Sequence, residues 1–188
     1  MIGPPDQGNR SRREAIAAVA AGGGAALLAG CGSHTLRSRV KKGARVAPGD
    51  VNVLNRLLEV EYHAIAAYTA GLPFLLRPER KAAKQFLGQD VTHASTLAGL
   101  IKQAGGKAIT PSASYALGQP RPADILALLQ ELEAQQLAAY IQMIPGLTHG
   151  KLRSTVAAIM ANDAQHLAVL RQERGQSPIP SPFATGAE

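Results

Sequence analysis

The sequence predicts an all-α fold, a four-helix bundle built from two helical hairpins joined by one long crossover. Three observations lead to this prediction. The chain has 188 residues, of which 46% are hydrophobic and only 4% aromatic, and its alanine-rich composition favours helices. Apolar residues recur at helical spacing in four separate segments. The connections between these segments are short, long and short, in that order.

The ends of the four helices are indicated by capping and breaking residues. Asp50 is a candidate N-cap for the first helix. Pro78 and Pro122 suit the first turn of the second and third helices, and Gly105 suits the position just after the second. The bundle is therefore expected to cover residues 50–175, with a flexible tail at 176–188. The predicted helices are 50–71, 78–104, 122–144 and 151–174.

The long connection, residues 105–121, contains proline and glycine and has no helical periodicity. A helix of about 22 residues is roughly 33 Å long, whereas 17 extended residues reach about 55 Å. This connection is therefore long enough to cross the whole length of a bundle.

The N-terminus has the features of an export signal. A basic segment with Arg12 and Arg13 precedes a short apolar stretch, which is too short to span a bilayer. The paired arginines resemble a twin-arginine signal, although Ala15 stands where a large apolar residue is usual. The run Leu28-Ala29-Gly30-Cys31 resembles a bacterial lipobox, in which the cysteine receives a lipid. Residues 1–30 are therefore expected to be a signal peptide, and Cys31 the lipid attachment point of a protein held at the bacterial cell membrane from outside the cytoplasm.

The positive charge is concentrated near this leader. The formal net charge is +7, and residues 31–49 carry five basic side chains, which predicts a basic linker between lipid and bundle. The remainder of the chain is close to neutral and has no basic stripe with interleaved aromatic residues. Nucleic acid is therefore not an expected partner.

An internal repeat relates the two hairpins. Glu61 and Tyr68 recur 72 positions later as Glu133 and Tyr140, in the shared pattern E-x-x-x-[IL]-A-A-Y. The second and fourth helices each carry Asp-x-x-His, as Asp90/His93 and Asp163/His166, 73 positions apart. The same two motifs thus occur twice, in the same order and at nearly the same separation.

Helical periodicity separates the buried acids from the exposed ones. Glu61 and Glu133 share stripes with leucine and tyrosine residues, so both are expected in the core. The i, i+3 spacing places each Asp and His of Asp-x-x-His on one side of its helix. Glu59 and Glu131 fall on the opposite, wet face of their helices, together with His63 and Gln135.

Residues 50–175 resemble the ferritin-like di-metal carboxylate proteins. That family surrounds two iron or manganese ions with one Glu from each of two helices and a Glu-x-x-His from each of the other two. Asp replaces Glu in both paired motifs here, which shortens each arm by one methylene. The resemblance implies that the two metal ions are held by Glu61, Asp90, His93, Glu133, Asp163 and His166.

Charge balance supports metal at such a site. Four carboxylates and two neutral imidazoles carry four negative charges, which two divalent ions would cancel, whereas unpaired buried charges are costly. The alternative hypothesis is a metal-free polar network. Tyr68 and Tyr140 lie near the carboxylates, where they either bond to them, relay electrons or only pack in the core. Gln136, three residues after Glu133, is either a hydrogen-bond donor to the ligands or a solvated side chain, and the second interpretation is preferred.

The resemblance implies oxidation of Fe(II) by oxygen or peroxide, or disproportionation of peroxide by manganese, and the sequence does not decide between them. A different class of function is a metal-free scaffold that meets a partner at the cell surface, in stress or desiccation tolerance. The expected partners are metal ions and the membrane, through the lipid. Association with further copies of the chain is left open.

Overall fold

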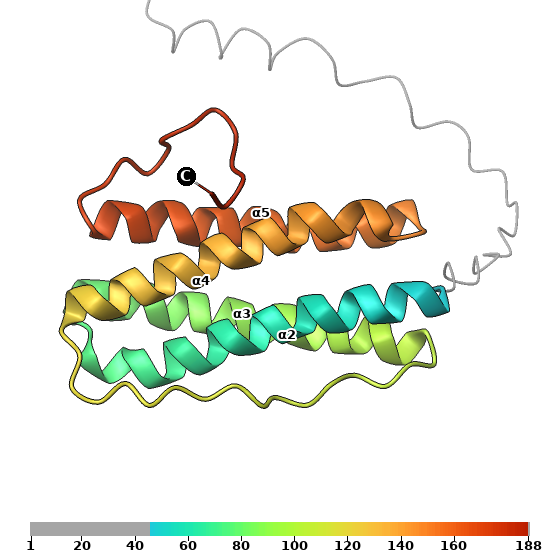
Figure 1. Cartoon of the computed structure of the whole chain (residues 1–188), viewed down its shortest axis with the longest axis horizontal. Helices are drawn as coiled ribbons and strands as arrows, with labels where there is room; N and C mark the ends of the chain where they lie inside the picture. Colours follow the sequence, from blue (N-terminus) through green and yellow to red (C-terminus); the bar gives the residue numbers. More distant parts are fainter. Residues whose placement is uncertain (1–45, 188) are drawn as a thin grey trace, which may run out of the picture. The chain divides into compact units, whose positions relative to one another are not determined.

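The computed structural model describes residues 46–187 and contains the predicted four-helix bundle (Figure 1). One hairpin is formed by α2 (Pro48–Gly71) and α3 (Arg77–Gln103), the other by α4 (Pro122–Met143) and α5 (Gly150–Glu173). Short 3-10 helices, η1 (Leu72–Phe74) and η2 (Ile144–Gly146), follow α2 and α4. The described residues form no strand. The predicted signal peptide with Arg12 and Arg13, the lipid site Cys31 and most of the linker lie outside the described residues.

Three of the helices begin with a proline in the first turn and an acid at the third helical position. The acids Asp50, Glu79 and Asp124 each accept a hydrogen bond from the backbone N–H of the residue before the helix. The expectation that Asp50 is the N-cap was wrong, because α2 begins at Pro48 and Asp50 lies inside the first turn.

Asp50 also joins the two hairpins. Its fully buried carboxylate accepts bonds from the Thr148 backbone N–H (2.9 Å) and hydroxyl (2.7 Å), just before α5. Burial alone would raise the pKa of Asp50, but the hydrogen bonds from Thr148 outweigh it and lower the pKa. The carboxylate is therefore stabilised in its charged form.

The hairpins pack along α2 and α4, and two apolar clusters fill the bundle at its two ends. One cluster is centred on leucines such as Leu54 and Leu57 with Tyr140, the other on Tyr68 with Phe86 and Leu129. Gly71 lies so close to Ile125 of α4 that a Cβ would come within 2.7 Å of its Cγ2 atom. This close contact brings the end of α2 against the start of α4.

The crossover between the hairpins runs along the outside of the α2/α3 hairpin, as Figure 1 shows. Gly105, with φ of 76°, ends α3. The Asn55 side chain of α2 then holds the crossover by donating to the Lys107 carbonyl and accepting from the Ile109 N–H. The predicted crossing of the whole bundle is confirmed.

The C-terminal segment, expected to be a flexible tail, contains no helix beyond α5 and turns back over the second hairpin (Figure 1). Gly186 lies against the backbone of α4, where a Cβ would meet the Ala134 oxygen at 2.2 Å. The segment is therefore placed on the bundle at that point, which no larger residue could approach as closely.

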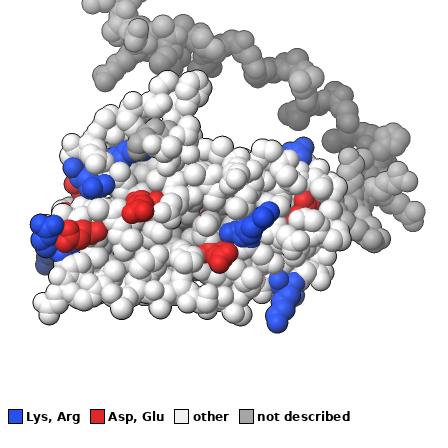
Figure 2. Space-filling view, viewed as in Figure 1, with Lys and Arg blue, Asp and Glu red and all other residues white. Residues whose placement is uncertain are grey.

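The described helices are too short or too polar to cross a membrane. Acidic and basic side chains are interspersed on the face of the molecule drawn in Figure 2.

Candidate metal centre

The structure brings the six acids and histidines of the repeated motifs into one buried network. Every helix contributes to it, and no member exposes more than 8% of its surface. The network lies between the two apolar clusters of the core. It consists of Glu61 on α2, Asp90 and His93 on α3, Glu133 on α4, and Asp163 and His166 on α5.

The two histidines direct their Nδ1 atoms at the carboxylates. His93 Nδ1 lies 3.2 Å from Asp163 Oδ1 and 3.7 Å from Glu61 Oε2. His166 Nδ1 lies 3.1 Å from Glu133 Oε1 and 3.6 Å from Asp90 Oδ1. Each imidazole therefore faces acids from both hairpins.

Asp90 lies at the centre of the network. Ligand atoms of Glu61, Asp90 and His93 lie within 4.8 Å of one another, and so do those of Asp90, Asp163 and His166. The repeat would place Glu133 beside Asp163 and His166, and Glu133 Oε1 does lie 3.1 Å from His166 Nδ1. Asp90 lies 3.8 Å from His93 and 3.6 Å from His166. Asp163 likewise lies 3.2 Å from His93 and is grouped with His166.

Each core tyrosine binds the glutamate of the opposite hairpin. Tyr68 of α2 donates to Glu133 Oε1 at 2.6 Å, and Tyr140 of α4 donates to Glu61 Oε1. Burial and the nearby carboxylate charges raise the pKa of both phenols, so they stay protonated as donors. The tyrosines thus bond to the carboxylates as well as packing in the core.

Two glutamines complete the site: Gln136, for which the less favoured expectation of a hydrogen-bond donor is the correct one, and Gln89, which no sequence pattern indicated. Gln136, expected in solvent, is 1% exposed and donates from Nε2 to Glu61 Oε2 at 3.2 Å. Its position three residues after Glu133 was the available signal, because that spacing keeps it on the buried stripe. The Oε1 atom of Gln89 on α3 lies 2.8 Å from His166 Nε2.

The contact with Gln89 fixes the orientation of His166. Since the Gln89 oxygen can only accept, His166 Nε2 carries the hydrogen, and a neutral ring presents a lone pair at Nδ1. Phe86 stacks on the same ring with centroids 4.2 Å apart. This is the arrangement of a metal-binding histidine, with its second nitrogen held by a neighbouring acceptor.

Burial and mutual repulsion raise the pKa values of three of the four acids. Burial, followed by the charges of Glu133 and Glu61, raises the pKa of Asp90 to about 10. Burial and the charge of Asp163 raise the pKa of Glu133 well above its ordinary value. Burial raises the pKa of Asp163 to about 6, against the opposing influence of His93. Without a cation, the four carboxylates therefore cannot all be ionised near neutral pH.

The pKa values of the two histidines shift in opposite directions. Burial disfavours protonation of His93, but its interactions with Asp163 and Glu61 outweigh this and raise its pKa to about 10. Burial lowers the pKa of His166 to about 4. The metal-free network thus holds one imidazolium and one neutral imidazole. Bound protons, in place of metal cations, neutralise part of the negative charge of the acids.

The donor set fits divalent iron or manganese. Seven buried side-chain atoms of this network and of Gln136 form no regular hydrogen bond with the described residues, although two of them, His93 Nδ1 and Asp163 Oδ1, face each other at 3.2 Å. They include both oxygens of Asp90, both of Asp163, Glu133 Oε2 and His93 Nδ1. Carboxylate oxygens and imidazole nitrogens are ligands of these metals, and buried polar atoms without partners are rare in proteins.

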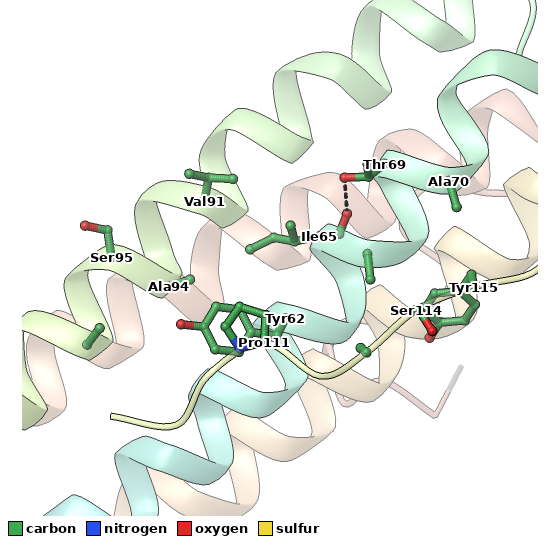
Figure 3. A pocket seen from close by; sticks show the side chains of 13 residues that line it. Tyr62, Ile65, Thr69, Ala70, Val91, Ala94, Ser95, Pro111, Ser114 and Tyr115 are labelled. Atoms are coloured by element: carbon green, nitrogen blue, oxygen red, sulfur yellow. Dashed lines mark hydrogen bonds between the residues drawn. The ribbon is translucent and has the colours of Figure 1, made fainter. Parts of the chain in front are cut away.

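A separate groove of about 600 Å³ lies between α2, α3 and the crossover (Figure 3). Its lining is mostly apolar, with Ile65, Val91 and Ala94 among its members. The Thr69 hydroxyl is already bonded to the Ile65 carbonyl at 2.6 Å. The groove contains no charged side chain and is therefore unsuited to a cation.

Comparisons with known proteins agree with the four-helix fold. No curated protein matches the chain significantly in sequence. The crystal structure of a conserved hypothetical protein, rv2844, from Mycobacterium tuberculosis is similar, with a TM-score of 0.63 and 18% identity over 72% of this chain and 96% of that one. This likeness concerns the fold alone. The family model for the ferritin-like domain matches residues 49–176. The chain therefore belongs to the ferritin-like domain family.

Proposed function

We propose that this bundle is a dinuclear iron or manganese protein that oxidises Fe(II) or consumes peroxide. The observation that carries the proposal is the set of buried carboxylate oxygens without hydrogen-bond donors, namely both oxygens of Asp90, Asp163 Oδ2 and Glu133 Oε2, beside the two imidazoles. Two divalent ions would cancel the four negative charges of the acids and replace the protons that the metal-free network must hold.

The ligands would divide between two positions around Asp90. Glu61 and His93 would hold one ion and Glu133 and His166 the other, with Asp90 and Asp163 beside both histidines to supply further oxygen ligands. When bound, the ions supply the redox chemistry for electron transfer to oxygen or peroxide. The protein's own residues keep the site dry, orient the ligands through Tyr68, Tyr140, Gln136 and Gln89, and keep the tyrosine protons in place.

The test is metal analysis of the bundle purified without added metal, combined with thermal unfolding under anaerobic Fe(II) or Mn(II). A hundredfold excess over the dissociation constant should stabilise the fold by about 2.7 kcal/mol. Replacing both His93 and His166 with Leu should abolish this gain. Unchanged melting curves with both ions would instead favour a metal-free scaffold that interacts with a partner at the cell surface.

Export and lipid anchoring form the second part of the proposal. They are supported by the Arg12-Arg13 pair and by the run ending at Cys31. Two or more acyl chains at Cys31 would anchor the protein stably outside the cytoplasm. Cys31→Ala should release the protein from the membrane fraction or leave it held by an uncut leader. A lipid-labelled band that persists in this variant would contradict the assignment.

A further inference from the structure

One end of the bundle, drawn on the right of Figure 1, exposes positive side chains and no acid among the described residues. The segment before α2, the end of α3 and the start of α5 meet there, where Val46, Gln103 and Lys151 line a cavity of about 110 Å³. Four exposed basic residues belong to this end, which we call the basic end: Lys102, Lys107, Lys151 and Arg153.

Contacts between separate elements form the basic end. The Lys107 carbonyl accepts a hydrogen bond from the Asn55 side chain of α2, which holds the start of the crossover against that helix. The Arg153 guanidinium donates to the Leu147 carbonyl, which keeps it at the connection between α4 and α5. The cluster of charge is therefore a feature of the folded bundle and not of one run of sequence.

The acids near this end do not neutralise it at the surface. Asp50 is fully buried, and its carboxylate accepts hydrogen bonds from Ala47 and Thr148. Along α2 and α4, the nearest exposed acids are Glu59 and Glu131, which lie about 16–18 Å from the helix ends. That separation exceeds the Debye length of about 8 Å at physiological ionic strength.

The opposite end has a different pattern of charge. It is also rich in lysine and arginine, but acids lie among them, as the left side of Figure 2 shows. Arg121 forms an ion pair with Asp124 at 2.7 Å. Glu79 in the first turn of α3 and Glu173 at the end of α5 lie at the same end. Attraction of this end to a negative surface is therefore opposed by its own acids.

The chain also leads from the basic end to the proposed lipid site. Val46 lies there, and the 14 residues 32–45 separate it from Cys31. Fully extended, 14 residues span at most about 50 Å, and the linker 31–49 adds five more basic side chains. A lipid attached at Cys31 would therefore keep a bilayer within reach of the basic end.

We propose that the basic end docks on an anionic lipid surface, such as a bilayer that contains phosphatidylglycerol, with the start of α2 toward the membrane. The inference rests on the proposed lipid anchor for the presence of the membrane, whereas the attraction itself requires only the exposed cations. Attraction of Lys and Arg to an anionic bilayer falls off within a Debye length. The docking is therefore reversible and sensitive to salt.

The first experiment measures sedimentation of the Cys31→Ala chain, which cannot be lipidated at this position, with vesicles of equal parts phosphatidylglycerol and phosphatidylcholine. In this background, Lys102→Gln/Lys151→Gln should bind at least about tenfold more weakly. The matched control Lys81→Gln/Lys84→Gln removes two exposed charges from the opposite half of α3 and should bind like its parent. Since leader and linker are the same in all three chains, equal affinities, or equal losses in both double variants, would overturn the docking surface.

The second experiment measures orientation in the lipidated protein. Cys31 is the only cysteine, so a dye can be attached selectively to Ser154→Cys at the basic end or to Ala123→Cys at the opposite end. Energy transfer to acceptors on the lipid headgroups should favour Ser154→Cys, and more strongly with phosphatidylglycerol than with phosphatidylcholine alone. The same preference in both vesicles would overturn the proposal. Failure to lipidate Cys31 would instead count against the anchor, while the first experiment still tests the docking.

Discussion

Tyr68 of α2 donates its 2.6 Å hydrogen bond to Glu133 of the other hairpin and not to Glu61 of its own helix. Tyr140 mirrors this bond by donating to Glu61. The two bonds cross the interface between the hairpins and fix one oxygen of each glutamate. The other oxygen of Glu133 is left without a partner, which makes it available as a ligand.

Removing the phenol of Tyr68 should weaken both the fold and the site. Tyr68→Phe keeps the buried ring but leaves Glu133 without its donor, so we expect a loss of about 1–3 kcal/mol in unfolding free energy of the metal-free protein, measured by urea denaturation. Tyr62→Phe is the control, because the half-buried Tyr62 has no hydrogen-bond partner in the described structure. Equal effects of the two substitutions would show that the crossed bond adds nothing.

The metal-free protein should lose stability as the pH rises. Asp90 and His93 both have raised pKa values of about 10, so the folded state holds protons that the unfolded chain releases at lower pH, and stability falls as the pH rises toward 10. The lowered pKa of His166, about 4, acts oppositely, removing stability as the pH falls from 6.5 to 4. Glu133 and Asp163, whose pKa values are also raised, add to the loss above pH 4 and together with Asp90 outweigh His166. The melting temperature should therefore already fall between about pH 5 and pH 6, and should fall by about 5 °C or more by pH 9.5.

Bound metal should prevent this loss of stability at alkaline pH, because it displaces the same protons. Metal affinity should therefore rise with pH, which calorimetry in two buffers of different ionisation enthalpy would detect as proton release. The double variant Asp90→Asn/His93→Gln is the control, and its metal-free melting temperature should vary much less between pH 6 and 9.5. A slope that persists in this variant would place the titrating groups elsewhere.

The shared position of Asp90 predicts unequal effects of two similar substitutions. Asp90→Asn removes a carboxylate that reaches both ligand groups, whereas Glu61→Gln affects only the group of His93. Metal analysis after dialysis should therefore give loss of both ions in the first variant and retention of about one in the second. Identical stoichiometries would contradict a central role for Asp90.

Asp50 should contribute far more to stability than its counterpart in α4. Asp50→Ala leaves the N–H and hydroxyl of Thr148 without their acceptor and should cost about 2–3 kcal/mol in unfolding free energy. Asp124→Ala, which removes an exposed acid from the same position of a helix, should cost less. Because the pKa of Asp50 is lowered, its contribution is present above pH 4 and disappears as the pH falls further. Equal losses in denaturation experiments would contradict the link between hairpins.

Much of this architecture follows from the sequence. The helices, the crossover and the burial of the six acids and histidines could be predicted because they depend on periodicity and on an internal repeat. The partners of Tyr68 and Tyr140 could not, because periodicity assigns a side chain to a face without saying which neighbouring helix it meets. The same limit applies to Asp50, whose partner Thr148 lies 98 residues away in sequence.

Departures from the repeat were also hard to predict. Gln136 is buried where the first half has Ala64, and a glutamine beside an acid resembles an exposed residue until its helix is packed. At this position the two halves of the bundle differ, whereas Asp90 and Asp163 each lie beside both histidines and keep the two-fold pattern.

The crossed network at the centre also determines how the hairpins align. An interface of leucines alone would tolerate sliding of one hairpin along the other, since apolar contacts are not directional. A shift of one helical turn, about 5.4 Å, would separate both tyrosines from their glutamates and leave these acids buried without donors. The polar centre therefore selects a single register for two hairpins whose similar sequences would otherwise permit several.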